Sequence, residues 1–108
     1  MCMIFGVTGR QFPAPVLMPH FNLARSRGPD MAKLIPAGPC WLGFQRLSIM
    51  DLSPAGMQPF ALDGDWVVCN GEIYGFRAIR RELSATYRFS SESDCEILLP
   101  LYREYGEP

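Results

Sequence analysis

A short apolar segment, residues 2–7, most constrains what this chain can fold into. It begins at Cys2, and the turn sequence Thr8-Gly9-Arg10 ends it. An apolar run of this length before turn residues is typical of a buried strand. Because successive side chains of a strand point to opposite faces, both faces of this strand are apolar except at Cys2. The segment therefore predicts a strand that other elements cover on both faces.

Three further segments have the length and composition of strands. They span residues 40–45, 65–69 and 87–89. Residues 51–64 lie between the first two and are expected to form a structured loop, because they contain two prolines and two glycines (Pro54, Pro59, Gly56, Gly64).

Three helices are predicted among these strands. Pro19 suits the first position of a helix that would run to about residue 26, and apolar residues at helical spacing predict another helix over 75–84. Ser93 and Glu96 have the spacing of a capping box, which would open a helix ending at Gly106 and kinked by Pro100. The mixture of short strands and helices indicates an α+β domain. Its sheet would be incomplete, which suggests a truncated domain.

Composition excludes several classes of function. The formal net charge is -1 and the basic residues are scattered, so no surface for nucleic acid is expected. No apolar run approaches the roughly 20 residues of a membrane helix, and no Lys or Arg precedes the apolar start as in a signal peptide. We therefore expect no membrane partner and a cytoplasmic location.

The four cysteines, Cys2, Cys40, Cys69 and Cys95, differ in what their positions imply. No pair is spaced as CxxC and the chain has one histidine, so neither a metal site nor a disulfide framework is expected. The last three are expected to be small buried apolar residues. Cys2 differs because it becomes the first residue if Met1 is removed, and its small side chain favours that removal.

An N-terminal cysteine carries a nucleophile and a base on one residue. An α-amine has a pKa of about 7.7 to 8.0, so near neutral pH it can accept the thiol proton, directly or through a water. Asn70-Gly71, at the end of a predicted strand, offers a side-chain amide and a backbone N–H to an oxyanion. The same dipeptide is also common in hairpin turns. Both interpretations stay open on these residues alone.

Three charged residues also have two interpretations. Arg46 could bind a substrate or pair with a structural carboxylate. Asp94 lies at a helix start, where the helix dipole favours a carboxylate in any case. Glu72 could be an ordinary surface residue.

Six motifs taken together resemble one known family. They are Met1-Cys2-Met3-Ile4-Phe5-Gly6, Arg27-Gly28-Pro29-Asp30, Arg46-Leu47-Ser48-Ile49-Met50-Asp51, Gln58-Pro59, Asn70-Gly71-Glu72-Ile73-Tyr74 and Ser93-Asp94-Cys95-Glu96. In this order they resemble the glutaminase domain of asparagine synthetases, a class II glutamine amidotransferase of the N-terminal-nucleophile (Ntn) hydrolase type. The resemblance covers nearly the whole chain.

The resemblance implies a role for each candidate residue. Cys2 would attack the side-chain amide of glutamine to give a γ-glutamyl thioester and ammonia, with Asn70 and the Gly71 amide as the oxyanion hole. The residues implied to bind the substrate are Arg46 for the α-carboxylate, Glu72 and Asp94 for the α-ammonium, and the backbone around Ile49 and Met50. A forked guanidinium matches a planar carboxylate in geometry and charge.

The resemblance also implies a fold and partners. The family's domain is a four-layer α-β-β-α sandwich, and residues 1–108 would be its N-terminal portion. No cofactor is implied for this segment. ATP and Mg would belong to a synthetase domain in cis, outside this sequence, that makes asparagine from aspartate. A homodimer is compatible with the resemblance.

Alternatives of three kinds remain open. Relatives in the same branch amidate acceptors other than aspartate, and a non-catalytic truncated fragment would keep the same motifs. Glucosamine-phosphate synthases and purine amidophosphoribosyltransferases share the N-terminal cysteine, but the motifs around Arg46 and Asn70 favour the asparagine-synthetase branch.

Overall fold

The apolar segment at the start of the chain forms β1 (Met3–Thr8), an edge strand of a three-stranded antiparallel sheet. Strand β3 (Cys40–Arg46) is central and β2 (Met31–Ala37) forms the other edge. This computed structural model describes residues 1–49 and 51–107. Because Met3 pairs with Gln45, Cys2 lies beside the end of β3.

Strand β2 is not predicted from the sequence. Its Pro36 pairs with Trp41 of β3, and its Lys33 is exposed. Proline and lysine disfavour a central strand, but both are tolerated at the edge of a sheet. The composition of residues 31–37 is therefore compatible with a strand only at the edge of a sheet.

A second, two-stranded antiparallel sheet consists of β4 (Phe60–Leu62) and β5 (Asp65–Val67). Asp63 and Gly64 connect them with φ angles of 49° and 87°. Positive φ at both central residues is typical of a type I′ hairpin turn, for which Asp-Gly is a favoured sequence. The predicted loop is therefore wrong over residues 60–62, whereas the strand predicted over 65–69 forms over 65–67.

The helical segments are α1 (Ala14–Phe21), η1 (Asn22–Arg27), η2 (Pro54–Gly56), α2 (Phe76–Leu83), η3 (Asp94–Ile97) and α3 (Leu98–Tyr105), where η marks a 3-10 helix. Helix α2 agrees with the prediction. Helix α1 begins at Ala14 because Pro15, and not Pro19, lies in its first turn. The strand predicted at 87–89 does not form.

Ser93 caps the start of η3 as predicted, but the reciprocal bonds of the predicted capping box are wrong. The Ser93 hydroxyl accepts a hydrogen bond from the Cys95 N–H (3.3 Å), and the Glu96 carboxylate turns to the preceding loop. Pro100 does not interrupt one continuous helix as predicted, because the chain changes from η3 to α3 before it. Pro100 thus lies in the first turn of α3, where its missing N–H would have no partner within the helix.

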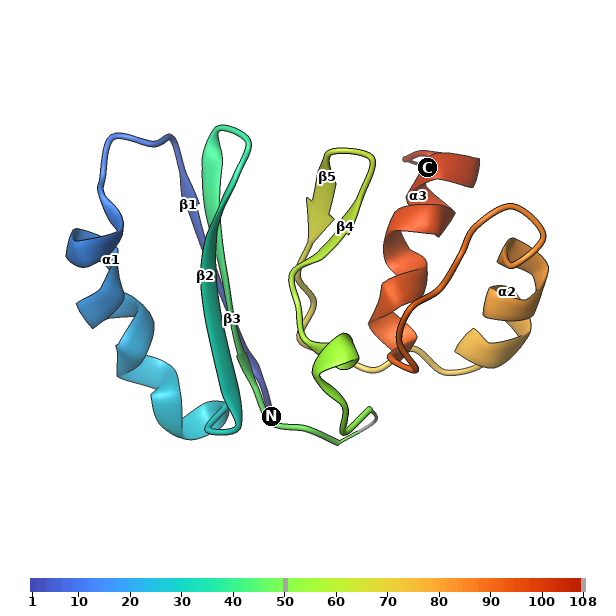
Figure 1. Cartoon of the computed structure of the whole chain (residues 1–108), viewed down its shortest axis with the longest axis horizontal. Helices are drawn as coiled ribbons and strands as arrows, with labels where there is room; N and C mark the ends of the chain where they lie inside the picture. The colour runs from blue at the N-terminus through green and yellow to red at the C-terminus, as the bar shows by residue number, and fades with distance from the viewer. Residues whose placement is uncertain (50, 108) are drawn as a thin grey trace.

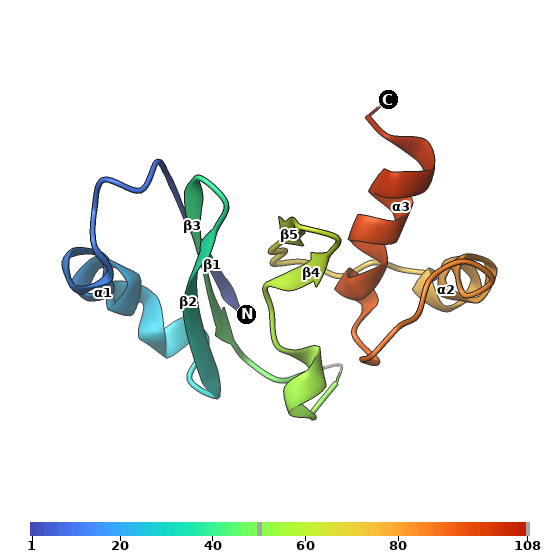
Figure 2. The same cartoon turned by 45° about the horizontal axis from the view of Figure 1, so that its top comes forward.

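The elements lie in successive layers. Figure 1 shows α1 and η1 on one side of the three-stranded sheet, the β4–β5 hairpin on the other side, and α2 and α3 beyond the hairpin. The rotated view in Figure 2 keeps this order. Within the described residues, no helix is long and apolar enough to cross a membrane.

Apolar contacts join α1 to the three-stranded sheet, and they join α2 and α3 to the elements around them. The rings of Phe5 and Phe21 pack edge to face at 5.6 Å, which joins β1 to α1. Beyond the hairpin, two buried clusters pack against α2 and α3, centred on Phe60, Cys95 and Leu99 and on Phe76, Leu83 and Ile97. Ile4, on the face of β1 away from α1, remains 48% exposed, so the prediction that both faces are covered is wrong.

The close packing of α1 on the sheet predicts a selective effect of one added methyl group. A Cβ at Gly43 would lie 2.7 Å from the Phe21 ring, whereas a Cβ at Gly6, on the neighbouring strand, would meet its nearest atom at 3.9 Å. We expect Gly43→Ala to lower the free energy of unfolding by about 1–3 kcal/mol. The matched variant Gly6→Ala should change it by less than about 0.5 kcal/mol. Urea unfolding of both variants checks this, and equal effects would contradict it.

Candidate functional site

A pocket of about 360 Å³ lies between the end of β3, the segment after β5 and the start of η3. It brings together residues that are far apart in the sequence. The predicted site residues that line it are Cys2, Arg46, Ile49, Asn70, Gly71, Glu72 and Asp94. The remaining one, Met50, lies outside the described residues.

Cys2 reaches the pocket because it continues β1 past the last residue paired with β3. Its sulfur accepts a hydrogen bond from the Leu47 N–H at 3.3 Å and lies 3.5 Å from the Leu47 carbonyl oxygen. The Arg27 Nε donates to the Cys2 carbonyl at 3.4 Å. The sulfur is therefore held by backbone groups of the residue after Arg46. No motif in the sequence predicts this contact with Leu47.

The motif at residues 27–30 packs against the end of β3. The Asp30 N–H donates to the Arg46 carbonyl at 3.0 Å, and the Asp30 carboxylate accepts the Ser48 N–H at 2.7 Å. A Cβ at Gly28 would lie 2.2 Å from the Gln45 carbonyl, so only glycine fits there. The motif thus fixes the backbone on both sides of Arg46.

Arg46 is buried and is anchored at one nitrogen. Its Nη1 donates to the Ser53 carbonyl at 2.6 Å and lies 3.9 Å from the Met31 sulfur. Within the described part of the chain, Arg46 forms no direct ion pair, but its charge acts on the nearby Asp51 carboxylate. A buried guanidinium with no carboxylate in direct contact favours an anionic ligand.

Gln58 holds the backbone just before Asn70-Gly71. Its buried side-chain amide accepts the Cys69 N–H at 2.6 Å and donates to the Cys69 carbonyl at 3.1 Å. These two bonds continue the hydrogen-bonding pattern of the hairpin beyond the Phe60–Val67 pair, with the Gln58 side chain in place of a backbone partner. The hairpin turn lies at Asp63-Gly64, so Asn70-Gly71 does not serve as one.

The two acidic candidates differ in burial. Asp94 is 5% exposed, and its Oδ2 accepts the Ile73 N–H at 2.6 Å. This bond joins η3 to the segment that follows Asn70-Gly71, so Asp94 does more than begin a helix. Glu72 is exposed and accepts a hydrogen bond from the Tyr74 hydroxyl at 3.2 Å.

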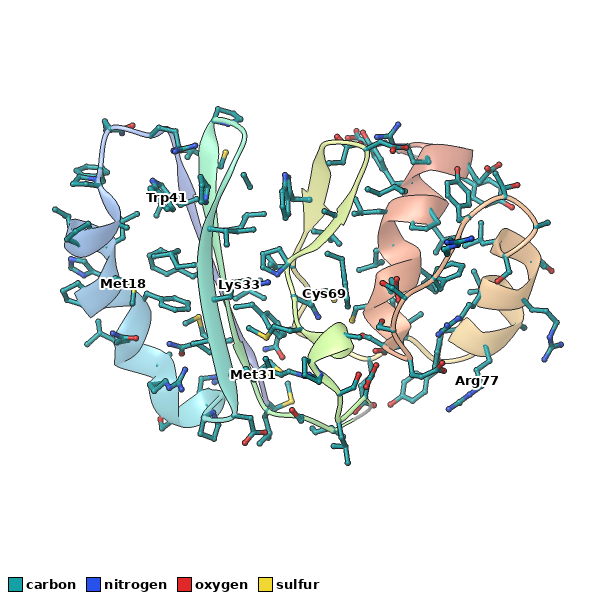
Figure 3. All side chains as sticks on the ribbon, viewed as in Figure 1. Met18, Met31, Lys33, Trp41, Cys69 and Arg77 are labelled. Atoms are coloured by element: carbon teal, nitrogen blue, oxygen red, sulfur yellow. The ribbon has the colours of Figure 1, made fainter. Side chains whose placement is uncertain are left out.

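Two further cysteines, Cys69 and Cys95, line the pocket. Figure 3 shows Cys69 between the hairpin and α3, where it packs against the cluster that contains Cys95. Burial raises the pKa of the Cys95 thiol, and the neighbouring Cys69 and Asp94 raise it further, so Cys95 remains a thiol and is a poor nucleophile. Cys40 and Cys69 are half-buried, not fully buried as predicted, and all four cysteines are free.

Within residues 1–49 and 51–107, no group of three or more His, Cys, Asp or Glu side chains is placed to hold a metal ion.

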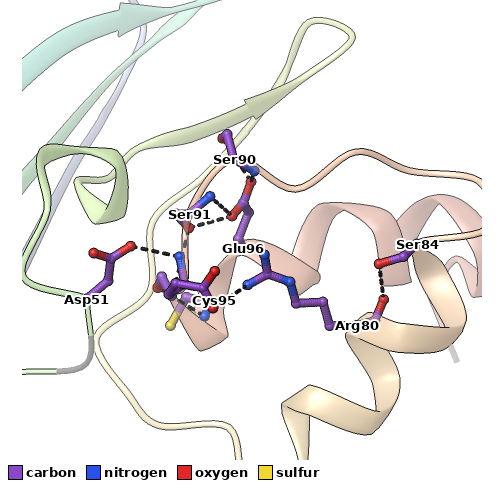
Figure 4. Close-up of polar contacts among 9 residues, drawn as sticks. Asp51, Arg80, Ser84, Ser90, Ser91, Cys95 and Glu96 are labelled. Atoms are coloured by element: carbon purple, nitrogen blue, oxygen red, sulfur yellow. Dashed lines mark hydrogen bonds and ion pairs between the residues drawn. The ribbon is translucent and has the colours of Figure 1, made fainter.

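Asp51 is a site residue that sequence reasoning missed, although it closes the motif at residues 46–51. It lines the pocket, is 8% exposed and accepts the N–H group of Ser53 at 2.8 Å. It also accepts the N–H group of Glu92 at 2.7 Å (Figure 4). Hydrogen bonds from the Ser53 hydroxyl and from these two N–H groups lower the pKa of Asp51 to about 2, with a smaller contribution from Arg46. Asp51 is therefore a carboxylate at neutral pH.

The chain belongs to the glutamine amidotransferase domain family, which matches residues 1–108. It is 39% identical to asparagine synthetase B [glutamine-hydrolyzing] of Escherichia coli over 98% of this chain and 20% of that relative. It is 42% identical to asparagine synthetase [glutamine-hydrolyzing] 1 of Bacillus subtilis, and 41% identical to amidase chyE of Penicillium rubens. These two matches cover 75% and 79% of this chain and 13% of each relative. The chain thus spans a fifth or less of the length of these relatives.

The lowered pKa of Asp51 predicts a pH dependence of stability. A carboxyl whose pKa falls on folding stabilises the folded state above its unfolded pKa of about 3.9, and this contribution is lost as the pH falls toward the folded value of about 2. Asp51→Asn lacks this ionisation. We therefore expect the stability difference between the wild-type chain and Asp51→Asn to shrink as the pH falls from about 5 to about 2.

Urea unfolding of both proteins across this pH range measures the difference. Parallel curves would contradict the prediction. Asp65→Asn, at an exposed ion pair with Arg103, is the control. The difference in stability between this variant and the wild-type chain should change much less as the pH falls.

Proposed function

We propose that the chain, once Met1 has been removed, hydrolyses the side-chain amide of free glutamine with Cys2 as the nucleophile. The observation that carries this proposal is a single pocket in which the Cys2 sulfur, the buried Arg46 and the buried Asp94 occur together. Free glutamine has one α-carboxylate and one α-ammonium beside its amide. The pocket thus offers a nucleophile and the complement of both charges.

Binding of the amino-acid end would use opposite charges. Arg46 would bind the α-carboxylate through the guanidinium nitrogens that do not hold Ser53. Asp94 and Glu72 would accept the α-ammonium. Asp94 already uses one oxygen for the Ile73 N–H, which leaves acceptor capacity on the other. The backbone around Ile49 and Met50 would complete this end.

The chemistry would proceed through a thioester. The Cys2 sulfur attacks the amide carbon, and the thiol proton passes to the α-amine of Cys2 and then to the leaving nitrogen, which departs as ammonia. The Asn70 side-chain amide and the Gly71 N–H would stabilise the oxyanion of the tetrahedral intermediate. Water then attacks the thioester carbon, which releases glutamate and restores the thiol.

The layered arrangement supports a further proposal about the fold. The order of α1, sheet, hairpin and the α2–α3 pair suits the N-terminal portion of a four-layer α-β-β-α Ntn-hydrolase sandwich. We also propose that the ammonia serves an ATP-dependent synthetase domain joined to this one, which makes asparagine from aspartate. ATP and Mg would be bound there.

A second candidate function has the same first step and a different ammonia acceptor. Two fungal relatives, at 46% and 41% identity, are named amidases and not asparagine synthetases. None of the pocket residues described here contacts an ammonia acceptor in the mechanism above, so the pocket is compatible with either product.

Covalent labelling tests the nucleophile. A diazoketone analogue of glutamine should add once to the chain, at Cys2, and intact mass should show that Met1 is absent from the labelled protein. Cys2→Ala should give no adduct, whereas Cys40→Ala, remote from the pocket lining, should label as the wild-type chain does. Adduct formation on Cys2→Ala would refute the mechanism. A folded wild-type chain that never reacts would favour a non-catalytic fragment.

Substitution of Arg46 tests the binding of the carboxylate. Arg46→Lys keeps the positive charge but loses the planar guanidinium that can donate two hydrogen bonds to one carboxylate. We therefore expect KM for glutamine to rise about tenfold or more, while kcat changes much less. Arg77→Lys is the matched control, because Arg77 lies exposed on α2, away from the pocket (Figure 3). An unchanged KM with a large loss of kcat would reject this role for Arg46.

A further inference from the structure

Asp51 is a buried carboxylate that the proposed chemistry does not use. Its two oxygens bind two separate segments of the chain. Oδ1 accepts the N–H of Ser53 at 2.8 Å, two residues ahead, and Oδ2 accepts the N–H of Glu92 at 2.7 Å, 41 residues away. Figure 4 shows this second bond crossing from the loop after β3 to the segment before η3.

Each of these segments carries one half of the proposed amino-acid site. The Ser53 carbonyl accepts the Nη1 of Arg46 at 2.6 Å, so the turn that Asp51 holds also anchors the guanidinium. Glu92 is two residues before Asp94, which would receive the α-ammonium. A single carboxylate therefore connects the cationic half of the site to the anionic half.

Packing keeps this connection short. A Cβ at Gly56 would lie 2.5 Å from the Nη2 of Arg46 and 2.9 Å from the Cβ of Asp51, so both side chains press against the same glycine. Glu96 holds the other segment from behind, since its two carboxylate oxygens accept the N–H groups of Ser90 and Ser91, both at 2.8 Å. Neither segment can shift without breaking charge-assisted hydrogen bonds.

We propose that Asp51 is a positioning residue that sets the separation between Arg46 and Asp94 and thereby selects ligands carrying both an α-carboxylate and an α-ammonium. This inference rests on the proposed function of the pocket. A ligand with both charges must reach both halves at once, so its affinity depends on their separation. A ligand with one charge contacts only one half of the site, so its affinity does not depend on the separation of Arg46 and Asp94.

The test compares three amides in Asp51→Asn. Asparagine has one acceptor oxygen in place of two and presents an NH₂ group to the other N–H, so one of the two connections is lost. The ligands are glutamine, glutaramate, which lacks the α-amine, and 4-aminobutanamide, which lacks the α-carboxylate. KM for glutamine, and inhibition constants for the two analogues, are measured on the chain after removal of Met1.

Asp51→Asn should weaken glutamine about tenfold or more, while kcat and the affinities of both analogues change by less than about threefold. Glu92→Gln is the matched control. It keeps the backbone N–H that Asp51 binds and changes only an exposed side chain, so all three ligands should behave as with the wild-type chain. If Asp51→Asn does not fold, Ser53→Ala is the second variant. It removes only the hydroxyl that helps lower the pKa of Asp51, and it should show the same selectivity with smaller changes in affinity.

Equal weakening of all three ligands in the variant would overturn the proposal, because it would show a general structural defect. An unchanged KM for glutamine would overturn it as well. A wild-type chain that binds glutamine no better than either analogue would overturn the proposed function together with this inference. A failure confined to Asp51→Asn or Ser53→Ala leaves the proposed function standing.

Discussion

The antiparallel pairing of β1 with β3 is the constraint on which the rest of the site depends. Its register places Met3 opposite Gln45. Cys2, just before Met3, therefore lies opposite Arg46, just after Gln45, and both side chains are on the same face at the same end of the sheet. A slip of β1 by one residue would place Cys2 opposite a neighbour of Arg46, so the two side chains would fall on opposite faces of the sheet. The packing of Phe21 on Gly43 opposes such a slip, since no other residue leaves room for the ring.

The opposite wall of the pocket is built differently, by side chains that satisfy backbone groups in segments without regular structure. Gln58 pairs with Cys69, Asp51 with Ser53 and Glu92, and Glu96 with the loop before η3. Buried backbone groups need partners, and here amide and carboxylate side chains supply them. This gives irregular segments a fixed shape, which a site with two charged halves requires.

The sequence predicted the elements whose signals are local. Strands near residues 40 and 65 and helix α2 could be read from length and spacing, whereas β2 was missed because Pro36 and Lys33 disfavour a strand unless it lies at an edge. The candidate residues were found through motifs, but no spacing rule could bring Asn70 into one pocket with Cys2. Asp51 could not be recognised from sequence because its second partner lies 41 residues away.

The two edges of the three-stranded sheet differ in how they would meet another chain. The outer strand β2 has Pro36, which offers no N–H, and the charged Lys33, and both oppose the addition of a foreign strand. Strand β1 contains neither a proline nor a charge, and its Ile4 side chain is half open to water. Of the two edges, β1 is therefore the one whose backbone can accept a further strand, and it leads directly to Cys2.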